Sequence, residues 1–172
     1  VNPAPGYGGS CFPKDTNAMA QMGRKYGAHL NLIETTIAKN DERKISMGKR
    51  VIAALNGSRD GRIAVWGLAF KGGTDDCRES PAMEILSEIL RHSKNVTVYD
   101  PKAMDNARKQ LGDEVTYAPD EYEACRGADL LVILTEWEDF KTADLNKIRS
   151  MMKTHRILDL RNMLDAGAVR AA

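Results

Sequence analysis

Hydrophobic residues recur in two different patterns along this chain, and the pattern changes near residue 60. Before that point the spacing is helical, which predicts a first helix from Pro13 to about Tyr26 and a second over residues 31–55. Gly27 is suited to ending the first helix, and Asn31 to capping the second.

The second predicted helix is long for a small protein. At 1.5 Å per residue it extends roughly 37 Å, which is more than a small domain buries by itself. Its apolar positions are Ile33, Ile37, Ile45, Ile52 and Leu55. The length favours packing against a second subunit. The alternative is a solvent-facing helix, because residues 39–44 are polar on all sides.

Strands and helices alternate after a glycine-containing break over residues 56–61. Strands are expected over residues 62–70, 95–100, 115–117, 129–135 and 156–160. Helices are expected to open at Ser80-Pro81, to span 104–111, to follow a cap at Asp120, and to span 145–152. The alternation predicts an α/β fold, in which a long-helix segment precedes a Rossmann-like parallel sheet covered on both faces.

Ligands of such sheets bind beyond the carboxyl ends of the strands. The turn after the first strand, residues 67–73, does not read GxGxxG in register, which argues against a dinucleotide at this turn. Lys71 can instead meet a phosphate through its ammonium group. Asp100 ends the second strand and has two interpretations, a ribose-binding acid or a structural acid before Pro101.

Composition narrows the class of protein. The chain has 172 residues, 42% hydrophobic and 28% charged, as expected for a globular protein. A net charge of +1 implies no general attraction to nucleic acid or membranes. Three cysteines without a CxxC pair indicate reduced thiols in the cytoplasm, and three scattered histidines make no metal site. We find no signal peptide and no membrane-spanning apolar run.

The most informative segment is 5–15, which reads Pro-Gly-Tyr-Gly-Gly-Ser-Cys-Phe-Pro-Lys-Asp. Its glycines let the backbone approach a ligand, and Pro13 suits the first turn of a helix. Cys11 therefore precedes a helix N-terminus with Lys14 close by, and both favour the thiolate. The alternative is a buried structural cysteine, but the polar flanks favour a nucleophile. Because no element precedes this loop, we expect the chain to be a piece of a longer protein.

Arg78 lies in the polar segment 74–80, before a helix that Ser80 is suited to cap. Its guanidinium group could bridge to a phosphate or pair with Asp75 or Asp76. The residues alone favour the ion pair.

Four motifs, in this order, resemble those of the UDP-glucose/GDP-mannose dehydrogenase family. They are residues 5–15, 67–81, 135–137 and 159–162. The Cys-Phe-Pro-Lys-Asp form and the Thr-Glu-Trp motif favour the members that act on UDP-glucose over those that act on GDP-mannose or UDP-N-acetyl sugars. The resemblance covers nearly the whole chain.

The resemblance implies a domain organisation. Residues 1–12 match an active-site glycine/cysteine loop, 13–57 part of a helical central region, and 61–165 a UDP-binding α/β domain, with a tail over 166–172. The 31–55 helix would support a homodimer. The family's N-terminal Rossmann domain, which binds most of the NAD, is missing from this sequence.

The resemblance also implies an activity, the oxidation of UDP-glucose to UDP-glucuronate with two NAD. Cys11 would carry a thiohemiacetal and then a thioester, and Asp15 would help to orient the hydrolytic water. Cofactor contacts match Cys11, Lys14 and Arg78. Substrate contacts match Asn2, Pro3, Ala4, Pro5, Gly6, Tyr7, Gly8, Phe70, Lys71 and Arg161.

Two alternatives stay open. The same chemistry could act on GDP-mannose or a UDP-N-acetylhexosamine, or the chain could be a nucleotide-binding or dimerisation module without catalysis. As a fragment, the chain is expected to be inactive alone and to bind UDP weakly.

Overall fold

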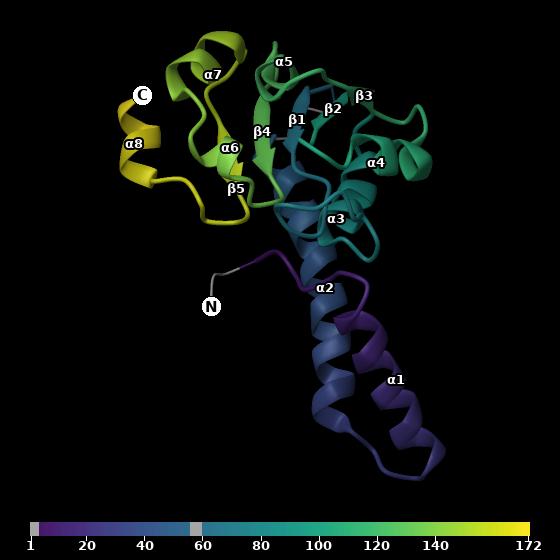
Figure 1. Ribbon diagram of the computed structural model, residues 1–172. Coiled ribbons are helices and arrows are strands. Elements are labelled where there is room, and N and C mark those ends of the chain that lie inside the picture. The colour runs from purple at the N-terminus through teal and green to yellow at the C-terminus, as the bar shows by residue number, and fades with distance from the viewer. Residues whose placement is uncertain (1–3, 56–59) are drawn as a thin grey trace.

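Two antiparallel helices form a hairpin that projects from an α/β domain (Figure 1). The computed structural model describes residues 4–55 and 60–172, so Asn2, Pro3 and much of the predicted break lie outside the described residues. Helix α1 spans Phe12–Lys25 and α2 spans Asn31–Ala54, close to the predicted bounds. The prediction that Asn31 caps α2 is wrong, because Leu30 takes the cap position and Asn31 is the first helical residue.

The buried face of α2 differs from the one that its apolar residues predict. Asn40, Lys44, Gly48 and Val51 are buried, whereas Ile45 is exposed. The interpretation of residues 39–44 as polar and solvent-facing on all sides is therefore wrong for Asn40 and Lys44. Both side chains lie on the face of α2 that meets the rest of the chain.

Helix α2 joins the hairpin to the α/β domain by packing against α3, which spans Pro81–Leu90. A Cβ atom at Gly48 would lie 2.6 Å from the Cβ atom of Glu88 and 3.2 Å from the carbonyl oxygen of Ile85. Only glycine permits this approach, so Gly48 fixes where α2 crosses α3.

The sheet has five strands, which are all parallel, as the alternation predicts. Their order is β3-β2-β1-β4-β5. The strands are β1 Ile63–Trp66, β2 Val96–Tyr99, β3 Thr116–Tyr117, β4 Leu130–Ile133 and β5 Ile157–Asp159. The first strand was predicted to continue to Phe70, which is wrong, because the chain turns away at Gly67 with a φ of +92°. The turn leaves residues 67–70 as a loop at the carboxyl end of the sheet.

The remaining helices of this domain are α4 Met104–Leu111, α5 Glu121–Cys125, α6 Glu138–Lys141, α7 Leu145–Met151 and α8 Ala166–Ala171. The bounds of α4 match the prediction, and Asp120 caps α5 by accepting a hydrogen bond from the backbone N–H of Glu123. Neither α6 nor α8 was predicted, and α8 lies in the expected tail. Ser80 does not cap α3 with its side chain, because its hydroxyl donates to the carbonyl oxygen of Leu68 at 2.8 Å.

Candidate active site

Cys11 occupies the cap position of α1, as the sequence predicts, and its side chain is exposed. Pro13 lies in the first turn. The backbone N–H of Asp15 donates to the carbonyl oxygen of Cys11 at 2.9 Å, and this spacing places the thiol and the carboxylate on one side of the helix. The ammonium group of Lys14 lies 3.1 Å from the Asp15 carboxylate. The start of α1 thus presents a thiol, a cation and an acid together.

Positive charge from two parts of the sequence gathers near this thiol. Asp15 is the main reason why the pKa of Lys14 is raised, and the charge of the Cys11 thiolate adds to it. Asp76 is the main reason why the pKa of Arg78 is raised, again with a smaller contribution from Cys11. The fold therefore brings Lys14 and Arg78 into one electrostatic environment with the cysteine.

Arg78 makes the ion pair that the residues alone favour. Its Nε atom lies 2.9 Å and its terminal nitrogen 2.7 Å from the two carboxylate oxygens of Asp76, and this contact lowers the pKa of Asp76. The backbone N–H of Arg78 also donates to Asp76 at 2.9 Å. This double contact holds the guanidinium group in place, and its predicted contact with the cofactor stays a prediction.

The glycine loop is pressed against the α/β domain. A Cβ atom at Gly8 would lie 2.1 Å from the carbonyl oxygen of Glu79 and 2.5 Å from Pro81. At Gly9, whose φ is +89°, a Cβ atom would lie 2.8 Å from the ring of Phe70. The N–H of Gly9 donates to the carbonyl oxygen of Glu79 at 3.2 Å. The two glycines thus let the loop that carries the thiol lie against the carboxyl end of the sheet.

Glu79 has an unusual backbone conformation at this contact. Its φ is 49°, in the left-handed region that non-glycine residues seldom adopt. Because its carbonyl oxygen accepts a hydrogen bond from the Gly9 N–H, this strained residue attaches the loop to the α/β domain.

The glycines of the turn after β1 lie against the protein's own chain. A Cβ atom at Gly67 would lie 2.4 Å from the Cβ atom of Thr135, and one at Gly72 would lie 2.1 Å from the carbonyl oxygen of Glu136. These glycines make room for the protein's own chain where a GxGxxG turn admits a pyrophosphate. The structure gives these glycines a packing role, and the argument against NAD at this turn stays a prediction.

Asp100 is a structural acid, one of the two interpretations that the sequence left open. It is buried, and one carboxylate oxygen accepts hydrogen bonds from the backbone of Leu68 and Ala69 and from the indole of Trp137, at 2.7–3.1 Å. The other oxygen accepts from the backbone N–H groups of Lys102 and Ala103. All five donors belong to the protein, so this carboxylate fastens loops and is not directed at a ribose.

Three predicted substrate contacts lie at the same end of the sheet. Phe70 is half-buried beneath Gly9, and Lys71 is exposed with its ammonium 5.4 Å from the centre of the Phe70 ring. Arg161 follows β5 and pairs with Glu136. Together with Glu136, it lines a hollow of about 370 Å³. The exposed Lys71 is thus accessible to an anion, whereas Arg161 is engaged with an acid.

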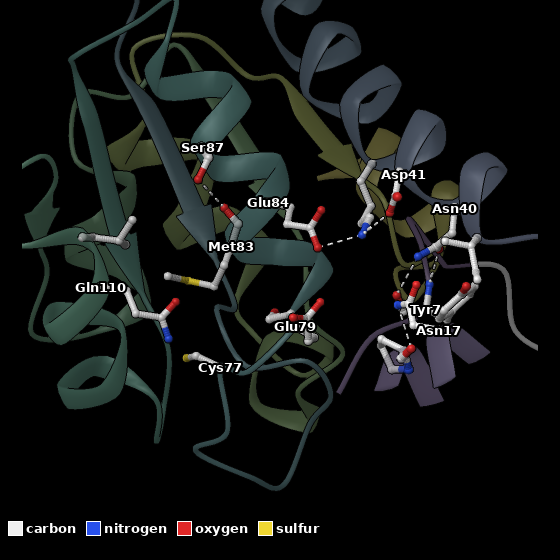
Figure 2. Close-up of a pocket in the computed structure, with 15 residues that line it drawn as sticks. Tyr7, Asn17, Asn40, Asp41, Cys77, Glu79, Met83, Glu84, Ser87 and Gln110 are labelled. Carbon is white, nitrogen blue, oxygen red and sulfur yellow. Dashed lines mark hydrogen bonds and ion pairs between the residues drawn. The ribbon is translucent and has the colours of Figure 1, made fainter. Parts of the chain in front are cut away.

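Sequence reasoning missed Asn40 and Lys44, two residues of α2 whose side chains contact the glycine loop. Figure 2 shows Asn40 next to Tyr7, and both line a cavity of about 550 Å³ between the hairpin and α3. The Asn40 side chain accepts a hydrogen bond from the N–H of Tyr7 at 2.8 Å and donates to its carbonyl oxygen at 3.1 Å. The ammonium of Lys44 lies 2.9 Å from Asp41 and 2.7 Å from Glu84.

A spacing signal could have identified these two residues. Asn40, Lys44, Gly48, Val51 and Leu55 recur at intervals of three or four, which is the spacing of one helix face. Only the last two are apolar, so a search for hydrophobic periodicity misses the face.

Two further limits on the site come from the described part of the chain. Across residues 4–55 and 60–172, no group of three or more His, Cys, Asp or Glu side chains is placed to hold a metal ion. Over the same residues, the helices are too short or too polar to cross a bilayer.

Comparison with known proteins identifies the family. Residues 64–166 match the model of the UDP-binding domain of the UDP-glucose/GDP-mannose dehydrogenase family, and residues 1–42 match that of its central domain. The chain belongs to this family. A UDP-glucose 6-dehydrogenase of Rhizobium meliloti is 47% identical over 164 residues, which are 95% of this chain and 37% of that protein. The family resemblance stated from the motifs is therefore confirmed.

Solved structures agree with the family assignment. A UDP-glucose dehydrogenase from Pyrobaculum islandicum superposes with a TM-score of 0.77 at 32% identity, over 92% of this chain and 38% of the other. A UDP-D-ManNAc dehydrogenase from Pyrococcus horikoshii gives a TM-score of 0.79 at 29% identity, over 95% and 37%. The chain thus spans little more than a third of the length of these family members.

Proposed function

We propose that this chain is the C-terminal part of a nucleotide-sugar dehydrogenase that oxidises UDP-glucose to UDP-glucuronate with two NAD. The observation that carries the proposal is the placement of Cys11, exposed at the start of α1 on a glycine loop that lies against the carboxyl end of a UDP-binding-domain sheet. The strong similarity to a UDP-glucose 6-dehydrogenase supports UDP-glucose as the substrate.

The residues of this chain supply the covalent part of the reaction. The Cys11 thiolate adds to the carbon of the sugar aldehyde and forms a carbon–sulfur bond, giving a thiohemiacetal. The second oxidation leaves the acyl group on sulfur as a thioester. Water then attacks the acyl carbon, with Asp15 placed one helical turn from the thiol to orient it, and the thiol leaves as the carboxylate forms. NAD, when bound, supplies the hydride acceptor for both oxidations.

The binding roles follow the same placement. Lys14 and Arg78 supply positive charge beside the thiol and would meet the anionic cofactor, which is bound mainly by the N-terminal domain absent from this sequence. Residues 2–8, Phe70, Lys71 and Arg161 would contact the nucleotide sugar. The proposal also includes a cytoplasmic location and a homodimer.

The decisive experiment replaces the thiol in the full-length protein. Cys11→Ser should prevent the formation of free UDP-glucuronate, because a serine hydroxyl is a far weaker nucleophile at neutral pH. Product analysis with each purified variant measures this. Cys125→Ala, which alters a buried thiol distant in sequence, should retain turnover. Complete turnover to the acid by Cys11→Ser contradicts the covalent mechanism.

A different sugar is the second candidate, because a UDP-D-ManNAc dehydrogenase is among the structural relatives. Measuring NADH production by the full-length protein with UDP-glucose, GDP-mannose and UDP-N-acetyl sugars decides between them. If the chain is instead a nucleotide-binding or dimerisation module without catalysis, the full-length protein should produce no NADH with any of these sugars, and Cys11 should be unreactive. The 172-residue chain alone should bind UDP weakly and produce no NADH.

A further inference from the structure

We propose that Asn40 is a positioning residue that holds the Cys11 loop to helix α2 by pairing with both backbone groups of Tyr7. This inference rests on the proposed role of Cys11. It assigns a function to a residue that lies 29 positions after the thiol, on a different helix.

Asn40 is an unusual residue for the middle of a helix. It is 9% exposed, and a buried amide costs free energy unless its donor and acceptor are both satisfied. Asparagine also has a low helix propensity. Both of its functions are satisfied by one loop residue, since the Oδ1 atom accepts from the Tyr7 N–H at 2.8 Å and the Nδ2 atom donates to the Tyr7 carbonyl at 3.1 Å. The side chain thus makes two hydrogen bonds to the backbone of Tyr7, as a residue of an adjacent β-strand would.

The contact is transmitted to the cysteine through aromatic packing. The ring of Tyr7 lies 4.7 Å from the ring of Phe12, centre to centre, in an edge-to-face arrangement with an interplanar angle of 78°. Phe12 is the first residue of α1 and the neighbour of Cys11. Asn40 therefore fixes the residue whose side chain packs against the start of the helix that carries the thiol.

Helix α2 offers a firm base for this contact. A Cβ atom at Gly6 would lie 3.0 Å from both Asn40 Oδ1 and Lys44 Cγ, so the loop lies directly on these two side chains. The Lys44 ammonium is held between Asp41 and Glu84 with only 6% of its side chain exposed, as Figure 2 shows for the two acids. Because Glu84 belongs to α3, its ion pair with Lys44 connects the part of α2 that contacts the loop to the α/β domain.

Two further hydrogen bonds attach other residues of the loop. Gly9 is bonded to Glu79 of the α/β domain, while Arg43, one turn after Asn40 on α2, donates to the carbonyl oxygen of Ala4 at 2.9 Å. The loop is therefore held at one end by the α/β domain and at two points by α2. Of these contacts, the Asn40 pair is the one that binds both backbone groups of a single residue.

The first measurement tests the two hydrogen bonds between Asn40 and Tyr7 in the 172-residue chain. Asn40→Ala should make hydrogen exchange of the Tyr7 amide about fivefold to tenfold faster, since it removes a hydrogen bond of ordinary strength. Asn31→Ala makes the same chemical change on the exposed start of α2 and should leave this exchange rate unchanged. Unchanged protection of Tyr7 in Asn40→Ala overturns the proposal.

The second measurement separates positioning from general stability, in the full-length protein. A displaced thiol captures the aldehyde poorly, so Asn40→Ala should release aldehyde and lower the yield from two NADH per sugar toward one. A purely structural role lowers the amount of active enzyme but keeps the yield at two. If Asn40→Ala does not fold, Asn40→Asp carries the test, because it keeps the acceptor for the Tyr7 N–H and loses the donor to the carbonyl.

The outcomes also distinguish this inference from the proposed function. If the parent protein yields two NADH and Asn40→Ala or Asn40→Asp does the same, the positioning role is wrong and the role of Cys11 stands. If Cys11→Ser also yields free acid with two NADH, the proposed covalent role of Cys11, on which this inference rests, is wrong.

Discussion

The three cysteines of this chain have very different surroundings. Cys11 is exposed at a helix start, whereas Cys77 and Cys125 are buried in the core. Burial raises the pKa of Cys77 to about 11 and that of Cys125 to about 12, from an ordinary value of 9.0. A thiol must ionise to react, so position and not residue type decides which sulfur is a nucleophile.

We therefore predict selective alkylation of Cys11 in the native chain. Iodoacetamide at pH 7.5 should label Cys11 alone, and labelling in denaturant should reach all three cysteines. Intact-mass and peptide mass spectrometry measure this, and Cys11→Ser serves as the control that should remain unlabelled when folded. Native labelling of Cys125 at a similar rate would contradict the burial argument.

The same two pKa values give the sign of a pH effect on that labelling. Between about pH 9 and the raised values, the folded chain holds the protons of Cys77 and Cys125 more tightly than the unfolded chain does. Their contribution to stability is thus full below about pH 9 and is lost as the pH rises toward 11 and 12. Labelling of the buried thiols should accordingly increase only in that alkaline range.

At the residue scale, the sequence shows local chemistry and hides distant partners. The cap position of Cys11 and the pairing of Arg78 with Asp76 depend on neighbours in the sequence, and both were predicted. Asn40 was missed because its partner, Tyr7, lies 33 residues away. Asp100 could not be assigned for the same reason, since the donors that saturate it include Leu68 and Trp137.

At the element scale, all five strands and most helices were predicted, whereas the short helices α6 and α8 were not. Helices α1, α2 and α4 contain enough turns for periodicity and breakers to define them. Helix α6 has four residues, too few for a period, and its Phe140 is positioned by stacking on Trp66 at 4.9 Å between ring centres. Tertiary packing forms α6, so local sequence does not predict it.

The crossing of α2 and α3 gives a prediction at this scale. Gly48→Ala should destabilise the chain by about 1–3 kcal/mol, because the added methyl group would overlap Glu88 and the backbone of Ile85. Helix propensity alone predicts the opposite, a gain of about 1 kcal/mol. Urea unfolding followed by circular dichroism measures the free energy of unfolding.

The matched control for this change is Ser46→Ala, at an exposed position two residues earlier on α2. It also replaces a residue by alanine but meets no neighbouring helix, so the free energy of unfolding should stay the same or rise slightly. A Gly48→Ala chain as stable as Ser46→Ala would mean that α2 and α3 do not pack as closely as the structure shows.

At the scale of the whole molecule, the glycine loop lies where the hairpin meets the α/β domain. Asn40 belongs to the hairpin and Glu79 to the α/β domain, and both form hydrogen bonds with the loop that carries Cys11. The sequence could indicate both parts but not their junction, because the contacts that form it are between residues far apart in the chain. The sequence also assigned subunit contact to the 31–55 helix, a prediction that stays untested.

The exposed apolar residues of the hairpin point to its outer side as a contact surface. Met19, Met22 and Tyr26 are 53%, 60% and 74% exposed, and their spacing of three and four residues places them on one side of α1 and its C-terminal cap. Such a cluster favours association. We predict that the 172-residue chain forms a dimer, seen by light scattering as twice its 19.0 kDa, and that the double variant Met19→Glu, Met22→Glu lowers this mass toward that of one chain.

Two comparisons make this last prediction specific. Gln21→Glu adds a charge at an exposed position of α1 away from the apolar side and should leave the dimer intact. Ile45→Glu adds a charge to α2, so a loss of the dimer only in that variant would place the contact on the 31–55 helix, as the sequence predicts, and not on α1. If the unaltered protein has the mass of one chain at high micromolar concentration, neither surface forms a strong self-contact. An apolar cluster of this kind should hold two chains together when it is buried between them.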